Sequence, residues 1–473
     1  MPLILALDIG TSSCRTALFD FDARRIAGTT VQQTYPLITS VVGAAEIEPV
    51  LLVRAVRQCL AETMAKARGR RIAGIGASCF WHSLIGTDAK GRPLTRVITW
   101  ADARCRSDAA ALREKFSERQ IHARTGCMLR ASFWPAKLVW LRRTQRRTFA
   151  RVRQWMSPAE WLQLTISGGA NCAFGMATGT GLFNPTKLAW DPALLAHCGI
   201  AADQLRTLSD DATAVAGSLA REFPALAGVP WFPAIGDGAA SNLGSGATRP
   251  GFAAINVGTS AALRVMRSGK VARAPFGLFC YRVDAGRFVV GGAVSDAGNL
   301  RAWCLRELRL ADEAAIEAAL AARPEPVAGL TVLPFWTSDR APTWNEEAVG
   351  VIHGVSLHTT ALDLLQAITE ASYHRIARIG ELVMSVEPRP PKFIVSGGIQ
   401  RSPAALQRLA DVLGQPIYPN DEMEASIRGA AIYALEKLGH AVPAFALPEP
   451  VKPRARYARL HALVRARQKE MET

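Results

Sequence analysis

The chain has 473 residues, of which 49% are hydrophobic and 20% are charged. This composition excludes a disordered or collagen-like protein, and the length is enough for two or three domains at roughly 150 residues each. Lysine and arginine number 56 against 40 aspartate and glutamate residues, which gives a net charge of +16. A charge of this size is compatible with an anionic substrate or with nucleic acid.

The densest basic run, from Arg142 to Arg153, has helical spacing and contains one aromatic residue, Phe149. Because surfaces that bind nucleic acid usually combine basic with aromatic side chains, the run indicates a solvated helix face, and we expect no nucleic-acid partner. A second basic stretch, 454–467, follows prolines at 448, 450 and 453. It predicts a Pro-rich linker and a basic helix over residues 446–473.

No apolar run approaches the roughly 18 residues of a membrane helix. The apolar start, 2–7, has no basic leader and runs into Asp8. The nine cysteines form no C-x-x-C pair and have no zinc-ligand spacing with histidine. We therefore expect buried thiols, no membrane association and a cytoplasmic protein.

The predicted elements follow one another as an α/β pattern. Strand-like runs cover 3–9, 15–19 and 26–34, helical apolar spacing covers 49–67, and a buried strand covers 72–77. In the second half, strands are predicted at 286–291, 330–335 and 392–395, and helices at 362–383, 403–413 and 425–438.

One segment occurs twice, at a distance of 248 residues. Asp8-Ile9-Gly10-Thr11-Ser12 matches Asn256-Val257-Gly258-Thr259-Ser260, and a strand follows each copy. A repeat on this scale predicts two related domains. We place them at 1–247 and 248–445, with a hinge at 245–251.

A Gly-Thr-Ser turn exposes backbone N–H groups and hydroxyls, which suit phosphate oxygens. A single turn of this kind is more often a plain hairpin, but two matched turns favour a cleft that grips a polyphosphate from both sides. The candidate phosphate-binding residues are Gly10, Thr11, Ser12, Gly258, Thr259 and Ser260. A carboxylate beside phosphates needs a cation, so Asp8 predicts Mg²⁺, held through water. Asn256 takes the same place in the second copy without a charge.

Three further features suit a site for a polyol and a nucleotide. Asp237 stands between two glycines at the end of an apolar stretch, where it either accepts a hydroxyl proton or forms an ordinary turn. The glycines of Ser396-Gly397-Gly398 let a flat ring lie against the backbone. Two clusters after strands offer a stacking face and polar groups for a sugar; they contain Trp81, His82, Asp102 and Arg104.

Taken in order, these motifs resemble the FGGY carbohydrate kinase family of the actin/hexokinase/Hsp70 superfamily, over roughly residues 3–440. The resemblance implies an α/β protein with two actin-like, ribonuclease H-like domains around a central nucleotide cleft. It also implies ATP and Mg²⁺ as cofactors and Asp237 as the catalytic base. The implied adenosine-binding residues are Gly397, Gly398 and Ser402.

Within the family, the chain is most similar to gluconokinases. Trp81-His82-Ser83-Leu84 resembles their Met-His-Ser-Leu, and residues 100–104 resemble their W-A-D-x-R. This implies a kinase that acts on a terminal hydroxyl of a sugar acid, gluconate in first place, whose carboxylate pairs with Arg104. The alternatives are a xylulokinase-like or other polyol kinase, and an actin- or Hsp70-like ATPase without sugar transfer.

Three departures from the family pattern lie on the sugar side. Trp81 replaces Met, residues 168–176 contain no acidic side chain, and Ser338-Asp339-Arg340 stands where Gly-Glu-Arg is usual. They put the substrate in question more than the chemistry. The sequence does not decide between a monomer and a homodimer.

Overall fold

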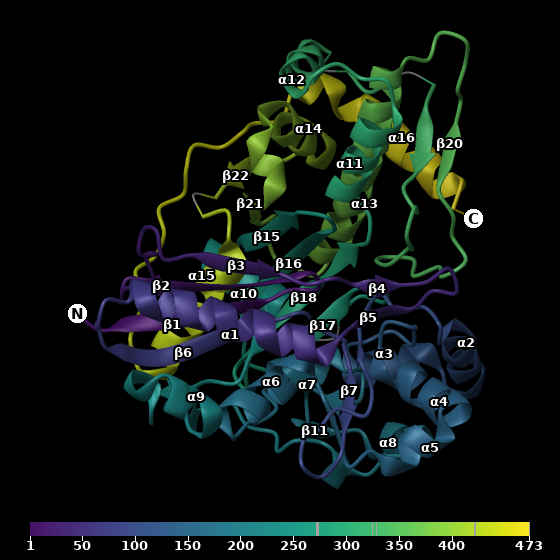
Figure 1. Cartoon of the computed structure of the whole chain (residues 1–473). Coiled ribbons are helices and arrows are strands. Elements are labelled where there is room, and N and C mark those ends of the chain that lie inside the picture. Colours follow the sequence, from purple (N-terminus) through teal and green to yellow (C-terminus); the bar gives the residue numbers. More distant parts are fainter. Residues whose placement is uncertain (271–273, 324, 328, 421, 473) are drawn as a thin grey trace.

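The computed structural model describes residues 1–270, 274–323, 325–327, 329–420 and 422–472. Two mixed sheets form its framework (Figure 1), and most residues of their central strands are buried. The first sheet has the order β12-β13-β6-β1-β2-β3, with β14 also paired to β6. Its strands are β1 (Leu3–Ile9), β2 (Ser13–Phe19), β3 (Val31–Thr34), β6 (Ile72–Cys79), β12 (Thr213–Ala214), β13 (Pro230–Trp231) and β14 (Ile235–Gly236).

The second sheet has the order β17-β18-β16-β15-β21-β22. Its strands are β15 (Phe252–Val257), β16 (Ala261–Ser268), β17 (Phe279–Arg282), β18 (Arg287–Val294), β21 (Lys392–Ser396) and β22 (Ile417–Pro419).

The two sheets share one topology. In each, three neighbouring strands run antiparallel (β1, β2 and β3; β15, β16 and β18), and a later strand, β6 or β21, joins the first in parallel. A long helix precedes that parallel strand: α1 (Pro49–Lys66) or α13 (Ala361–Met384). The prediction of two related actin-like α/β domains is confirmed.

The helices α10 (Asp237–Ser245) and α15 (Ala425–Lys437) join the two halves. A Cβ atom at Gly244 would stand 1.8 Å from the carbonyl oxygen of Ala425, and one at Gly429 would stand 1.8 Å from that of Ala240. Only glycine permits so close an approach of two backbones. Although α15 belongs to the second half of the chain, it packs on β1 and β6 of the first sheet.

The remaining elements of the first half surround its sheet. The helices are α2 (Arg106–Lys115), α3 (Glu118–Thr125), α4 (Trp134–Thr144), α5 (Arg146–Arg151), α6 (Pro158–Ser167), α7 (Phe174–Gly179), α8 (Pro192–Cys198) and α9 (Gly217–Glu222). The short strands are β4 (Ile38–Thr39), β5 (Ala45–Ile47), β7 (Ile85–Thr87), β8 (Val97–Ile98), β9 (Gln154–Met156), β10 (Phe183–Asn184) and β11 (Ala189–Trp190).

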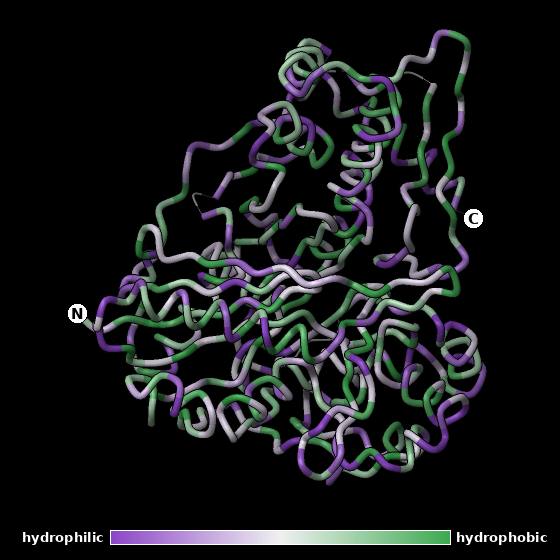
Figure 2. The backbone as a smooth tube through the Cα atoms, in the orientation of Figure 1, coloured by the Kyte–Doolittle hydropathy of each residue, from purple (hydrophilic) through white to green (hydrophobic). Residues whose placement is uncertain are grey.

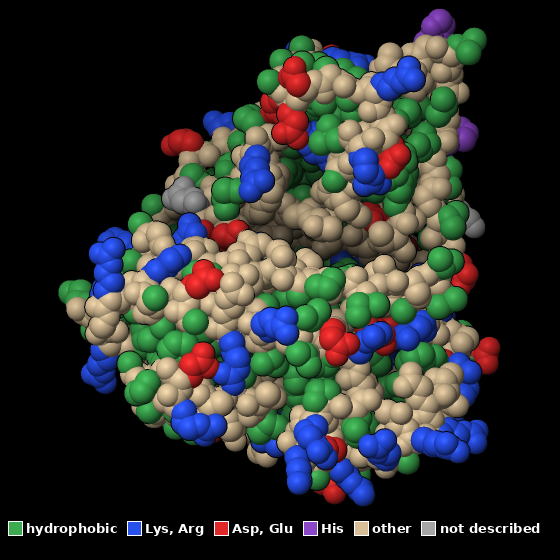
Figure 3. Space-filling model, viewed as in Figure 1, with side chains coloured by type: hydrophobic (Ala, Val, Ile, Leu, Met, Phe, Trp, Pro, Cys, Tyr) green, Lys and Arg blue, Asp and Glu red, His purple; other side chains and the backbone are tan. Residues whose placement is uncertain are grey.

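The second half adds helices above its sheet and ends in a helix. These elements are α11 (Gly298–Glu307), α12 (Glu313–Ala322), β19 (Thr331–Leu333), β20 (Val351–His353), α14 (Pro403–Leu413) and α16 (Ala458–Glu470). Along the outer helices, hydrophilic and hydrophobic residues alternate, as expected where one face packs inward (Figure 2). The space-filling view shows a hollow between the parts that carry the two sheets (Figure 3).

One predicted strand is shorter than expected. The run 26–34 forms a strand only at Val31–Thr34. Before it, Gly28 adopts a positive φ of 73°, and the hydroxyl of Thr29 donates to the carbonyl of Ile26, so the chain turns there. All nine cysteines are buried thiols, as predicted. In the described part of the chain, no helix is long and apolar enough to span a membrane.

Candidate active site

The first Gly-Thr-Ser turn connects β1 to β2. Its backbone closes through a hydrogen bond from the Gly10 amide to the Ser13 carbonyl (2.8 Å). The indole Nε1 of Trp100 donates to Thr11 Oγ1 (3.0 Å), while Ser12 is exposed at the tip. The turn is therefore held from one side and leaves its tip open.

Asp8 is the second-last residue of the buried strand β1, and side chains from both halves of the chain donate hydrogen bonds to it. Its Oδ1 accepts from Ser78 Oγ on β6 (2.6 Å), and its Oδ2 accepts from Ser426 Oγ on α15 (2.8 Å). Arg15 Nη1 lies 3.7 Å from Oδ2. A carboxylate offers about four acceptor positions, so acceptor positions remain for a water that binds a cation. The residues present fit a water-mediated Mg²⁺.

The second Gly-Thr-Ser turn connects β15 to β16 and closes one residue earlier. The Gly258 amide donates to the Ser260 carbonyl (2.9 Å). The start of α11 supports it, because Gly298 N donates to the Gly258 carbonyl (2.9 Å) and Asn299 N to the Thr259 carbonyl (3.2 Å). The side chain of Thr259 is exposed. Both turns thus keep a hydroxyl residue at the surface.

The segment that follows β21 lies against the backbone just before this second turn. Gly397 has a φ of 94°, and a Cβ atom there would stand 2.5 Å from the Val257 carbonyl oxygen. Gly398 follows it directly. The hydroxyl of Ser402 accepts from Ala405 N (3.0 Å) as the N-cap of α14 and donates to Glu317 Oε2 (2.6 Å). In this arrangement Ser402 is bound within the protein.

Asp237 is the first residue of α10 and follows β14. Its Oδ1 accepts from the Gly238 amide (2.7 Å). The indole of Trp81 covers the preceding residue so closely that a Cβ atom at Gly236 would stand 1.7 Å from Cε2. The two glycines that flank Asp237 in the sequence therefore make room for the groups around the carboxylate.

Burial raises the pKa of Asp237 to about 6. The guanidinium groups of Arg264 and Arg340 oppose this shift, and the negative charge of Asp8 adds to it. A carboxylate with a pKa near neutrality is a better proton acceptor than an ordinary aspartate and is still ionised at pH 7.

Trp81 and His82 form an aromatic wall beside Asp237. Trp81 Nε1 donates to the Gly175 carbonyl (2.9 Å), and the Trp81 and Tyr281 rings meet edge to face at 5.0 Å. His82 has a positive φ of 66°, and its Nδ1 lies 2.5 Å from the Gly179 carbonyl oxygen. Burial lowers the pKa of His82 to about 3. Because a carbonyl only accepts, Nδ1 carries the proton and Nε2 is left as an acceptor for a hydroxyl.

Asp102 and Arg104 lie side by side and bind each other. Arg104 Nε lies 3.0 Å from both Asp102 oxygens, and Nη2 contacts Asp102 Oδ2 (2.7 Å) and Glu46 Oε1 (2.5 Å). The guanidinium also stacks on Trp140 at 4.5 Å. Asp102 Oδ2 further accepts from the Ala45 amide (3.0 Å). Most of the donors of Arg104 are thus occupied within the protein.

Two arginines near Asp237 were not among the residues that sequence reasoning selected. Arg264, on β16, lies against Gly238, where a Cβ atom would stand 2.6 Å from Nε. Its Nε and Nη1 are buried and have no hydrogen-bond partner among the described residues. Arg340 donates to Ser295 Oγ and the Val294 carbonyl (both 3.1 Å). In the sequence, Arg264 could have been found as the single charged residue of the otherwise apolar stretch 261–266.

The chain matches the profile described as "FGGY family of carbohydrate kinases, N-terminal domain" over residues 3–244, and the C-terminal counterpart over 253–436. It is 27% identical to the gluconokinase of Bacillus licheniformis (92% of this chain, 88% of the relative) and 29% identical to the glycerol kinase of Rhodospirillum centenum (93% and 90%).

Among solved structures, the gluconate kinase from Lactobacillus acidophilus superposes with a TM-score of 0.89 at 25% identity, over 99% of this chain and 97% of the other. The two profile matches together span most of the chain, so the alternative of an ATPase without sugar transfer is not supported. The chain belongs to the FGGY family of carbohydrate kinases and is a sugar phosphotransferase that uses ATP.

Proposed function

We propose that this kinase phosphorylates the terminal hydroxyl of a sugar acid, with gluconate as the first candidate. The observation that carries the proposal is the buried guanidinium of Arg264, which lies near Asp237. Its Nε and Nη1 have no hydrogen-bond partner among the described residues. A gluconokinase relative and a gluconate kinase structure that covers nearly the whole chain support the same substrate.

An unpaired buried charge is costly, and a carboxylate is the group that pairs best with a guanidinium. A sugar acid supplies that carboxylate. With a neutral ketose or polyol, the charge of Arg264 is opposed among the described residues only by the nearby Asp237, and its Nε and Nη1 keep no hydrogen-bond partner there. Arg340 adds a second positive charge near Asp237. The site therefore favours an anion through groups that act directly around the catalytic carboxylate.

Arg104, the carboxylate partner that the sequence suggested, has fewer free donors than Arg264. Asp102 and Glu46 occupy its Nε and Nη2, which leaves Nη1 for a ligand. We propose that Asp102 and Arg104 shape the sugar pocket, while Trp81 offers a stacking face and His82 Nε2 accepts a sugar hydroxyl. Trp81 and His82 are held by backbone carbonyls, which orients both rings.

For ATP, we propose that the two turns face the phosphates, Gly10, Thr11 and Ser12 from the first sheet and Gly258, Thr259 and Ser260 from the second. Gly397 and Gly398 would lie against adenosine. Ser402 would contribute indirectly, because its hydroxyl caps the N-terminus of α14. When bound, Mg²⁺ would neutralise phosphate charge, and Asp8 would hold it through water.

In the proposed reaction, Asp237 accepts the proton of the substrate hydroxyl. The oxygen of that hydroxyl attacks the γ-phosphorus of ATP, the bond from this phosphorus to the β,γ-bridging oxygen breaks, and ADP leaves. Positioning and charge stabilisation supply most of the rate. Closure of residues 1–247 on 248–445 about the hinge at 245–251 would exclude water. The tail 446–473 packs on the second half of the chain through α16 and would move with it. The need for ATP and the nine buried thiols fit a cytoplasmic location.

The proposed function is tested with a panel of gluconate, xylulose, ribulose and glycerol, scored by ATP consumption. We expect gluconate to exceed the neutral compounds in kcat/KM by at least about tenfold, which corresponds to about 1.4 kcal/mol. A neutral compound as the best substrate would overturn the proposal.

Two variants then assign the carboxylate partner. Arg264→Met should remove most of the preference for gluconate over xylulose, and Arg104→Ala should reduce it only if Nη1 binds the acid. Arg267→Met is the matched control, because Arg267 lies on the same strand and pairs with Glu387 instead. Equal losses for acid and neutral substrates in Arg264→Met would exclude Arg264 as the carboxylate partner.

A further inference from the structure

We propose that Glu370, His374 and His461 form a binding site for a divalent transition-metal ion, with Zn²⁺ as the best match. The site lies between α13 and the C-terminal helix α16, outside the groups assigned to ATP and sugar. One ligand atom from each residue lies within 4.8 Å of the others. All three side chains are buried, with exposed fractions of 3%, 0% and 1%.

The two histidines are the first reason for this proposal. None of the four ring nitrogens of His374 and His461 has a hydrogen-bond partner among the described residues, and the ring centroids lie 5.5 Å apart. A buried polar group without a partner typically costs about 1–3 kcal/mol. Burial lowers the pKa of His461 to about 4 and that of His374 well below its usual range. Both rings are therefore neutral at pH 7, the form that binds metal.

The carboxylate of Glu370 is oriented by neighbours that leave one oxygen available. Gln366 Nε2 (3.0 Å) and Arg408 Nη1 both donate to Oε1. No described residue donates to Oε2. Such fixing of one carboxylate oxygen is typical of the groups that surround metal ligands. Glu370 and His374 are four residues apart on one helix, so they share a face, and His461 approaches from α16.

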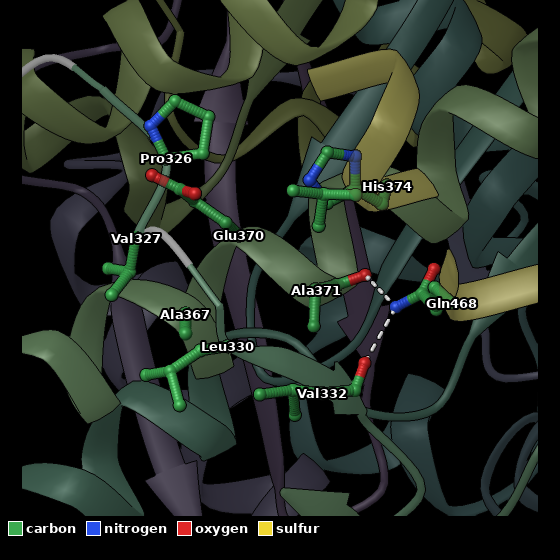
Figure 4. Close-up of a pocket in the computed structure, with 10 residues that line it drawn as sticks. Pro326, Val327, Leu330, Val332, Ala367, Glu370, Ala371, His374 and Gln468 are labelled. Atoms are coloured by element: carbon green, nitrogen blue, oxygen red, sulfur yellow. Dashed lines mark hydrogen bonds between the residues drawn. The ribbon is translucent and has the colours of Figure 1, made fainter. Parts of the chain in front are cut away.

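A small cavity adjoins the cluster and is lined by Glu370, His374 and Gln468 (Figure 4). Its volume of about 10 Å³ is close to what one water or one ion needs. The amide of Gln468 donates to the carbonyls of Val332 (2.9 Å) and Ala371 (3.1 Å), and its Oε1 is buried without a partner among the described residues. A water in the cavity is suited to be the fourth ligand.

Three ligand atoms thus lie within 4.8 Å of one another: one nitrogen of each imidazole, neither with a partner among the described residues, and one carboxylate oxygen of Glu370. A single water has only two hydrogens and cannot donate to all three atoms, whereas one cation accepts all three. Two imidazoles with a carboxylate suit Zn²⁺, Co²⁺ or Ni²⁺ and not Mg²⁺, which prefers oxygen ligands.

The surrounding charges are balanced without the metal. Arg408 is matched by Glu370, and Arg465 pairs with Glu381 (Nε–Oε1 3.0 Å). Asp411, which faces His461, is paired with Arg454. The cation would therefore bind through its ligand bonds rather than through a negative field, and it would fasten α16 to α13.

The test uses the full-length chain after dialysis against a chelator. Zn²⁺ or Co²⁺ alone is added, bound metal is counted by elemental analysis, and thermal unfolding is followed. We expect one equivalent per chain, a Co²⁺ absorption spectrum that indicates nitrogen ligands, and a higher Tm, because a ligand of the native state stabilises it.

His461→Asn should weaken binding at least about tenfold and abolish the Tm increase, since it removes one direct ligand of the metal. His358→Ala, at an exposed histidine, is the matched control and should bind like the wild type. Kinase activity with Mg²⁺ and ATP reports whether each variant is folded. Wild-type protein that takes up no Co²⁺ would overturn the proposal without any variant, as would equal uptake by wild type and folded His461→Asn.

Discussion

Trp81 lies flat against the backbone of Gly236, at a distance that excludes any side chain there. A Cβ atom at this position would stand 1.7 Å from Cε2 and 2.1 Å from Nε1 of the indole. The same indole limits Gly179, where a Cβ atom would stand 2.3 Å from Cδ1. At Gly238 a Cβ atom would stand 2.7 Å from Cζ3 of the same ring. The indole therefore fits beside Asp237 only because three nearby residues are glycines.

Replacement of Gly236 by alanine should displace this indole. Overpacking of a filled site typically costs about 1–3 kcal/mol, and here the displaced ring adjoins Asp237, the proposed catalytic base. We expect a lower Tm and a loss of kcat/KM of at least about tenfold. Gly169→Ala is the control, because its Cβ atom would meet Thr213 at an ordinary 3.6 Å. Wild-type kinetics in Gly236→Ala would show that the indole does not position the site.

Asp237→Asn keeps the shape of the side chain but cannot accept the substrate proton. Turnover should fall by roughly 10²–10⁴, while ATP binding, measured by calorimetry, should change little. Asp211→Asn, at an exposed aspartate, is the matched control and should retain full activity. Near-normal turnover of Asp237→Asn would remove Asp237 from its proposed role.

The pH dependence of kcat/KM should report the same carboxylate. Burial places the pKa of Asp237 at about 6, so the base is protonated and inactive at lower pH. We expect an acidic limb that bends near pH 6. The charge of Arg264 lowers this pKa, so in Arg264→Met the pKa should rise and the limb should move to higher pH. A limb that stays in place in Arg264→Met would contradict the electrostatic interaction between these two charges.

Asp8→Ala should raise the Mg²⁺ concentration needed for half-maximal activity and lower turnover, because it removes the charge that would hold the ion through water. The loss of Asp8 also frees two serine hydroxyls. Ser426→Ala removes one of those hydrogen bonds and keeps the carboxylate, so it serves as the control and should titrate with Mg²⁺ like wild type. An unchanged Mg²⁺ titration of Asp8→Ala would refute the proposed asymmetry with Asn256.

Local sequence patterns were sufficient for most of the framework. The apolar run 3–9 and the helical spacing over 49–67 correspond to β1 and to α1, because burial imposes these periods directly on the sequence. The repeated segment, with Asp8 in the first copy and Asn256 in the second, also predicted equivalent strands. In the structure, Ser78 on β6 lies opposite Asp8, and Ser396 on β21 lies opposite Asn256. The backbone hydrogen bond of the turn runs from Gly10 to Ser13 in the first copy but from Gly258 to Ser260 in the second, a difference that no periodicity reveals.

The partners of the charged groups, by contrast, depended on tertiary structure. Arg104 stood in a motif that suggested a substrate ligand, yet the fold places Glu46 and Asp102 against it. Arg264 stood in no motif, yet its strand carries it to Asp237. A hydrophobic periodicity in the sequence indicates only whether a residue is buried. Which partner a charged side chain contacts is decided by long-range packing, as when Ser426 donates to Asp8, 418 positions away.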